Sequence, residues 1–91
     1  MSEQIRRVVL EALGLYAERP LPEKADHLRP IEDLGFDSQD GVAVACELSE
    51  QLEFDIPNEI NPLVNDEEKR GRTIQEIVEF ISTLEAGQRN K

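Results

Sequence analysis

Three segments of this 91-residue sequence repeat their apolar residues at the spacing of an amphipathic α-helix, and this periodicity is the strongest constraint on the fold. It predicts helices over residues 3–18, 38–53 and 74–85. No segment alternates apolar and polar residues as a half-buried strand does, and no internal repeat is present. A chain of this length forms one small domain. We therefore expect a single all-α domain over residues 1–85, followed by a flexible tail over residues 86–91.

The ends of these helices carry residues that cap or terminate helices. Pro20 and Pro22 follow the first helix and end its pattern. Asp37 is a candidate N-cap for the second helix. Thr73, with Glu76 three residues later, has the capping-box pattern at the start of the last helix.

Two connecting segments complete the prediction. Residues 19–36 form a long irregular connection whose apolar residues are expected to pack on the core, and a loop of this length is often functional. Asn61 before Pro62 is typical of an N-cap and a first helical residue, and Gly71 of a residue just past a helix end. They predict a short helix near residues 62–70. The expected architecture is a small antiparallel four-helix bundle, with three main helices and one short helix.

The charge of the chain is strongly negative and unevenly distributed. There are 20 Asp and Glu against 10 Lys and Arg, which gives a formal net charge of −10. Twelve of the acids lie in residues 30–68, which contain no Lys or Arg. Nucleic acid and anionic membrane surfaces are disfavoured as partners because both attract positive charge. A surface of one sign instead favours docking of basic proteins, with compositional drift in an acidic protein as the alternative.

Few residues suited to catalysis or metal binding are present. Cys46 is the only cysteine, which excludes an internal disulfide and a Cys-rich zinc site. His27 is the only histidine and is expected to be a loop residue rather than part of a catalytic triad. The acidic segments that begin at Asp37 and Asp66 lack the ligand spacing of a calcium loop. No metal site is predicted. Without a secretory signal or an apolar run that could span a bilayer, we expect a cytoplasmic monomer.

The predicted helix over residues 38–53 separates its apolar and acidic residues onto different sides. At about 100° per residue, the core side consists of small and aliphatic residues, which are Gly41, Val44, Ala45, Leu48 and Leu52. The exposed side carries three carboxylates and a small apolar pair one turn apart, which are Asp40, Glu47 and Glu50, and Val42 and Cys46.

Ser38 is the candidate site of modification. It follows the Asp37 cap at the end of the long connection, where its side chain projects outward beside the unpaired N–H groups of the first turn. An anionic group attached there would lie near the positive end of the helix dipole, although Asp37 and Asp40 oppose it. On position alone, an ordinary serine at a helix start is the alternative.

The sequence around Ser38 gives a more specific indication. Residues 34–38 read LGFDS, an acid-rich helix follows, and residues 53–57 then read EFDIP. This order and spacing resemble the acyl carrier protein family, over a region from about Ile5 to Leu84. The family's attachment motif is Asp-Ser-Leu with a glycine two residues before the aspartate. The chain matches the glycine, the aspartate and the serine, and has Gln39 in place of the leucine.

The resemblance implies a carrier rather than an enzyme. A phosphopantetheinyl transferase would attach 4′-phosphopantetheine to Ser38 through a phosphodiester. The thiol of this arm would hold acyl groups as thioesters for the enzymes of fatty-acid, polyketide or related lipid synthesis. The second helix would be the recognition helix, on which Asp40, Glu47 and Glu50 meet basic docking patches of acyl-transfer and synthase enzymes. Val42 and Cys46 would add a small apolar contact.

The resemblance also implies that a growing acyl chain folds back into the bundle. The small residues Gly41 and Ala45 either leave room for such a chain or simply let the helices approach closely. Two other functions stay open from the sequence. One is a carrier of aminoacyl or peptidyl thioesters, and the other is a non-covalent acidic helical adaptor that docks basic proteins.

Overall fold

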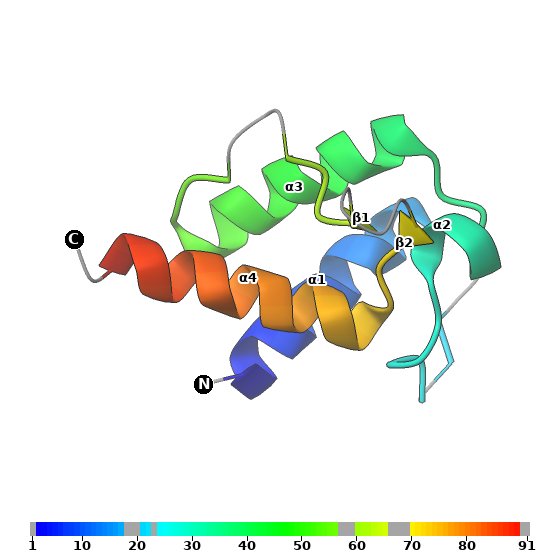
Figure 1. The fold of residues 1–91 in the computed structure, drawn as a ribbon, viewed down its shortest axis with the longest axis horizontal. Helices are drawn as coiled ribbons and strands as arrows, with labels where there is room; N and C mark the ends of the chain where they lie inside the picture. Colours follow the sequence, from blue (N-terminus) through cyan, green and yellow to red (C-terminus); the bar gives the residue numbers. More distant parts are fainter. Residues whose placement is uncertain (1, 18–20, 23, 57–59, 66–69, 90–91) are drawn as a thin grey trace.

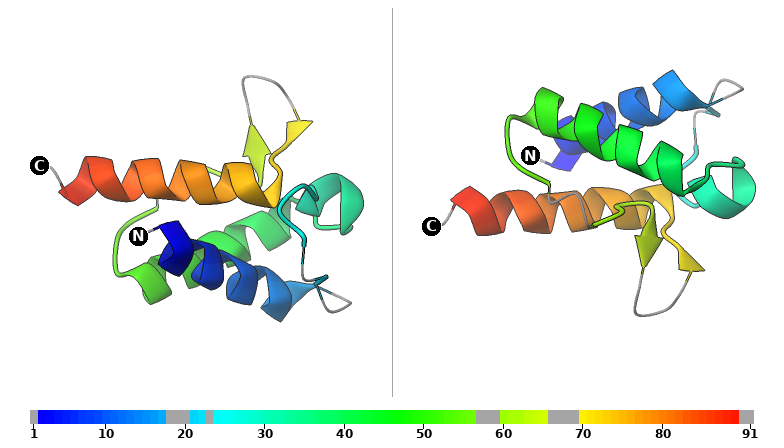
Figure 2. Two further views of the ribbon diagram at one scale, coloured as in Figure 1. Left: turned by 90° about the horizontal axis from the view of Figure 1, so that it is seen from below. Right: turned by 90° about the horizontal axis from the view of Figure 1, so that it is seen from above.

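The fold consists of four helices and one pair of short strands within the residues that the computed structural model describes, which are 2–17, 21–22, 24–56, 60–65 and 70–89. In chain order these are α1 (Ser2–Tyr16), α2 (Pro30–Asp33), α3 (Ser38–Leu52), β1 (Val64–Asn65), β2 (Arg70–Gly71) and α4 (Ile74–Arg89). α1 runs in the opposite direction to α3 and α4, and the three long helices surround the core (Figures 1 and 2). The prediction of a mainly helical fold with three main helices is confirmed.

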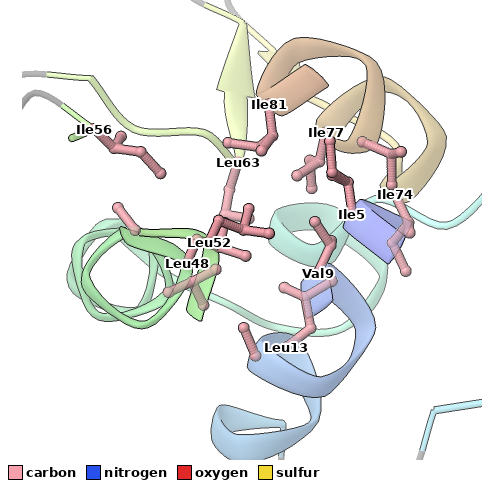
Figure 3. Close-up of a cluster of buried hydrophobic side chains, with 14 of the residues drawn as sticks. Ile5, Val9, Leu13, Leu48, Leu52, Ile56, Leu63, Ile74, Ile77 and Ile81 are labelled. Carbon is pink, nitrogen blue, oxygen red and sulfur yellow. The ribbon is translucent and has the colours of Figure 1, made fainter. Parts of the chain in front are cut away.

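The core is mostly aliphatic and is built mainly from the inward faces of α1, α3 and α4. The predicted core side of α3 is confirmed, since its buried residues are Gly41, Val44, Ala45, Leu48 and Leu52. Leu63, from the chain just before β1, is fully buried and lies between α3 and α4 (Figure 3). No buried residue in the described ranges is polar or charged. Burial of each such aliphatic side chain contributes roughly 1.5–3 kcal/mol.

The predicted short helix near residues 62–70 is wrong where the structure describes this segment, because residues 62–65 and 70 form a turn and strands. Residues 66–69 lie outside the described residues. Asn61 instead starts a turn, in which its Oδ1 accepts from the backbone N of Leu63 (2.9 Å) and its carbonyl accepts from the N of Val64 (3.1 Å). β1 then pairs antiparallel with β2, and Gly71 lies in that strand rather than past a helix end. The same Asn-Pro pair suits a turn, and the segment has too few apolar residues to form the buried face of a helix.

The connection over residues 19–36 contains a short helix, α2, that the sequence did not predict. After α2, the carbonyl of Pro30 accepts from the N of Leu34 (3.2 Å) and of Phe36 (2.9 Å), with Gly35 at φ +76° between them. This turn brings Phe36 into the core, where it is 4 % exposed. The expected packing of the connection is confirmed, because further apolar residues lie half-buried against the core, namely Leu21, Leu28, Ile31 and Leu34.

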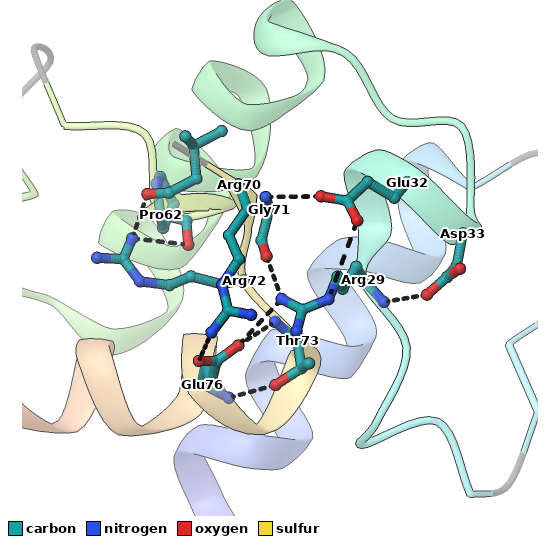
Figure 4. Close-up of polar contacts among 10 residues, drawn as sticks. Arg29, Glu32, Asp33, Pro62, Arg70, Gly71, Arg72, Thr73 and Glu76 are labelled. Atoms are coloured by element: carbon teal, nitrogen blue, oxygen red, sulfur yellow. Dashed lines mark hydrogen bonds and ion pairs between the residues drawn. The ribbon is translucent and has the colours of Figure 1, made fainter. Parts of the chain in front are cut away.

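A polar cluster joins α2 and β2 to the start of α4 (Figure 4). Arg29 donates to the carbonyl of Gly71 and lies 3.4 Å from Glu76 Oε1, while Glu32 accepts from the N of Gly71 (2.9 Å). The capping box of α4 is also present, since Thr73 N donates to Glu76 Oε1 (2.8 Å) and Glu76 N donates to Thr73 Oγ1 (3.1 Å). The Thr73 backbone N–H, above all, holds the pKa of Glu76 below its usual value.

The outer ends of the first and last helices differ from the prediction. α1 ends at Tyr16, and residues 18–20, with the predicted helix end and Pro20, lie outside the described residues. α4 continues to Arg89, so residues 86–89 are helical where a flexible tail is predicted. Leu84 still packs on the core near this end, and alanine at position 86 favours continuation of the helix.

Gly35→Ala should lower the free energy of unfolding by about 1 kcal/mol, because alanine at a positive φ adopts a strained left-handed conformation. A Cβ there would meet no atom within 4 Å, so the loss reports backbone strain alone. Gly14 is the matched control, since it lies exposed in α1 and is equally open. Gly14→Ala should raise the free energy of unfolding by about 0.5–1 kcal/mol. Denaturant unfolding measures both, and a stabilising Gly35→Ala would contradict this account.

Glu76→Gln should reduce stability at neutral pH and much less in acid. A carboxyl whose pKa is lowered by folding contributes stability above its unfolded pKa, and this contribution is lost as the pH falls through the folded value. The difference in unfolding free energy between the two proteins should therefore shrink below about pH 4. A difference that is independent of pH would show that the charge of Glu76 contributes nothing.

Candidate functional site

Ser38 is the first residue of α3, and its side chain is exposed. Asp37 precedes it in an extended conformation and caps the helix as predicted, with Oδ1 accepting from the N of Asp40 (2.9 Å). Asp40 returns the interaction, since its Oδ2 accepts from the N of Asp37 (3.0 Å). The backbone at Ser38 is thus held by this capping box on one side and by the Gly35 turn and buried Phe36 on the other.

The first turn of α3 can accommodate an anionic group on Ser38. The helical bonds begin with the N of Gly41 and the carbonyl of Asp37 (3.1 Å), so the N–H groups of Ser38 and Gln39 have no acceptor within the helix. These groups and the helix dipole favour negative charge near the serine hydroxyl. The carboxylates of Asp37 and Asp40 bind the backbone of the capping box. Their negative charges oppose an anion on Ser38, so the exposed hydroxyl and the two N–H groups without a helical acceptor are the features that favour one.

The predicted partner-binding residues all lie on α3, but they do not form one group. Val42, which is 49 % exposed, lines a surface pocket of about 240 Å³ together with Cys46 and Glu50. Asp40 and Glu47 are half-buried and do not line this pocket. At about 100° per residue, these two share a different side of the helix. The structure therefore brings the apolar pair together with only one of the three predicted carboxylates.

The second wall of this pocket comes from the chain after α3, and sequence reasoning missed it. α3 ends at Leu52, and the φ of 57° at the C-cap residue Glu53 turns the chain. Ile56 N then donates to Ser49 Oγ (3.3 Å), which folds the following segment back along the helix. Asp55, Ile56 and Ile60 complete the pocket. No helical periodicity could indicate this contact, because the hydrogen bond spans seven residues and depends on the turn between them.

The acidic surface is concentrated around α2 and α3. Residues 30–56 are described without a gap and carry eight acids and no Lys or Arg. Glu32 and Asp33 accept from the backbone N–H groups of Gly71 and Arg29. These two residues are exposed, as are Glu50 and Glu53. The remaining acids of this stretch, Glu59, Asp66, Glu67 and Glu68, lie outside the described residues.

Other features of the described chain do not extend this site. His27 is exposed in the connection before α2. The described ranges contain no group of three or more His, Cys, Asp or Glu side chains that could hold a metal ion. No described helix is both long and apolar enough to cross a membrane. A larger cavity of about 570 Å³ lies along α1, with Arg6, Arg7 and Leu10 in its lining, and it shares no residue with α3.

Comparison with known proteins found no family model and no solved structure that matches this chain. The site is therefore defined by its own geometry. Its central features are an exposed serine at a capped helix start and, along the same helix, a pocket with an acidic rim.

Asp37→Ala should lower the free energy of unfolding by about 1 kcal/mol, because it removes the acceptor for the N of Asp40. Asp37→Asn keeps a side-chain oxygen at the cap and should cost only a few tenths of a kcal/mol. Denaturant unfolding of both variants measures the difference. If the asparagine variant were as unstable as the alanine variant, the charge of Asp37 would matter more than its hydrogen bond.

Proposed function

We propose that this protein is an acyl carrier protein, which holds acyl intermediates as thioesters on a 4′-phosphopantetheine arm attached to Ser38. The observation that carries the proposal is the exposed Ser38 hydroxyl at the first position of α3, directly after the capping Asp37. The order of three long helices, with a long connection before the serine, also agrees with the family that the sequence resembles. An acyl-carrier-like fold is part of this proposal.

The chain contributes one nucleophile and leaves the catalysis to its partners. In the loading reaction, the Ser38 oxygen would form the new bond to phosphorus, and its proton would pass to a base of the phosphopantetheinyl transferase. The bond between that phosphorus and the nucleotide part of the coenzyme A donor would break. When bound, the arm supplies a thiol that holds an acyl group as a thioester. The exposure of Ser38 leaves the hydroxyl accessible to such a transferase.

α3 would also be the surface that partner enzymes bind. Val42 and Cys46 offer a shallow apolar contact with Glu50 at its rim, and Asp40 and Glu47 extend the negative charge around the helix. A basic patch with one small apolar side chain complements this surface. Exposed ion pairs each contribute about 0–1 kcal/mol, so docking would be weak and reversible. A monomeric carrier in the cytoplasm requires such docking, because it must bind and leave several synthase and acyl-transfer enzymes.

Co-expression with a broad-specificity phosphopantetheinyl transferase tests the proposal. The intact mass should increase by one phosphopantetheinyl group, because the Ser38 hydroxyl is exposed, and Ser38→Ala should abolish the increase. Thr83→Ala is the matched control, since Thr83 carries an exposed hydroxyl on α4 and its loss should leave loading unchanged.

An unchanged mass, in cells where a known carrier is fully loaded, would contradict the proposal and favour a non-covalent adaptor for basic proteins. If Ser38 is loaded, release of the native cargo with hydroxylamine and its mass analysis separate an acyl carrier from an aminoacyl or peptidyl carrier.

A further inference from the structure

The buried side of α3 begins with a glycine whose side-chain space is already filled. Gly41 lies one turn after Ser38, and a Cβ at this position would overlap the side-chain amide of Asn61. The next buried positions on this side are Val44, Ala45 and Leu48. A flexible group on Ser38 that entered the core along this stripe would therefore meet Asn61 first.

Asn61 is held in place by the turn that it forms. Its Oδ1 accepts from the N of Leu63 (2.9 Å), and the side chain of Leu63 is fully buried. Arg72 fastens the same turn, since its Nη1 donates to the carbonyl of Val64 (2.6 Å). The Arg72 guanidinium in turn lies 3.9 Å from the centre of the Phe80 ring, so the turn is tied to α4. Displacing Asn61 would disturb this whole set of contacts.

The core behind Asn61 is filled. Leu48, Leu63 and Ile81 are each fully buried, and Figure 3 shows Leu63 in the space between α3 and α4. The pocket beside Val42 and Cys46 has Ala45 and Ile56 of the core in its lining, but it does not reach Leu48, Leu63 or Ile81. Along the stripe that begins at Gly41, an alkyl chain could enter the core only by moving Asn61 and Leu63 together.

We propose that Asn61 closes the route from Ser38 into the core, and that the carrier therefore holds short or polar acyl groups outside the bundle. This inference rests on the proposed loading of Ser38. A short or polar acyl group exposes little apolar surface when it stays in water, whereas a long alkyl chain left outside would remain largely hydrated. The small size of Gly41 then serves the packing of Asn61 rather than the storage of cargo.

The test loads Ser38 with butyryl, octanoyl or dodecanoyl arms from the corresponding coenzyme A thioesters. The melting temperature and the rate of thioester cleavage by hydroxylamine are measured for each. In the native sequence, both should be nearly independent of chain length. Asn61→Ser keeps an oxygen that can accept from Leu63 N but opens the space beside Gly41. In this variant, octanoyl cleavage should slow by roughly tenfold, as burial of about two methylene groups would produce.

Asn65→Ala is the control, because it removes an amide from the same segment without opening the space beside Gly41, and its cleavage rates should match the native ones. Strong protection of octanoyl in the native sequence would overturn the proposal, and so would an Asn61→Ser variant that folds but gains no protection. Asn61→Ala provides a second variant if the serine variant does not fold. Failure to load Ser38 at all is a different result, because it overturns the proposed function itself.

Discussion

Burial of one side of α3 determines what its other sides can present. Val44, Leu48 and Leu52 are buried in the core, and a helix is stiff enough that fixing three inward positions fixes every outward one. Ser38 and Val42 are exposed on the remaining surface for that reason. The core holds no polar or charged residue among those described, so the acids of this part of the chain must all lie outside it.

The position of Ser38 along the helix has a second, local cause. The turn at Gly35 places Phe36 in the core, and the capping box of Asp37 and Asp40 then starts α3 at Ser38. A buried aromatic residue therefore lies two positions before an exposed hydroxyl, with one capping carboxylate between them. The concentration of negative charge around this point costs stability through repulsion, and aliphatic burial offsets it.

Local signals predicted most of the fold, and long-range contacts account for the errors. The three long helices, the Asp37 cap and the Thr73–Glu76 capping box depend on residues a few positions apart, which is the range in which helical periodicity is informative. α2 and the β1–β2 pair depend on contacts such as that of Arg29 with Gly71, some forty residues away in the sequence. The candidate site divides in the same way. Ser38 and its cap were predictable, whereas the Ser49–Ile56 bond that builds the pocket wall was not.

The fixed start of α3 affects how far a group attached to Ser38, as proposed, could move. A hydroxyl whose backbone is clamped on both sides gives a tether little freedom at its base. If Ser38 carries the proposed arm, the distance that the end of this arm can reach would then depend mainly on the length of the arm itself. Partner enzymes would have to place their catalytic centres within that radius of the docked helix.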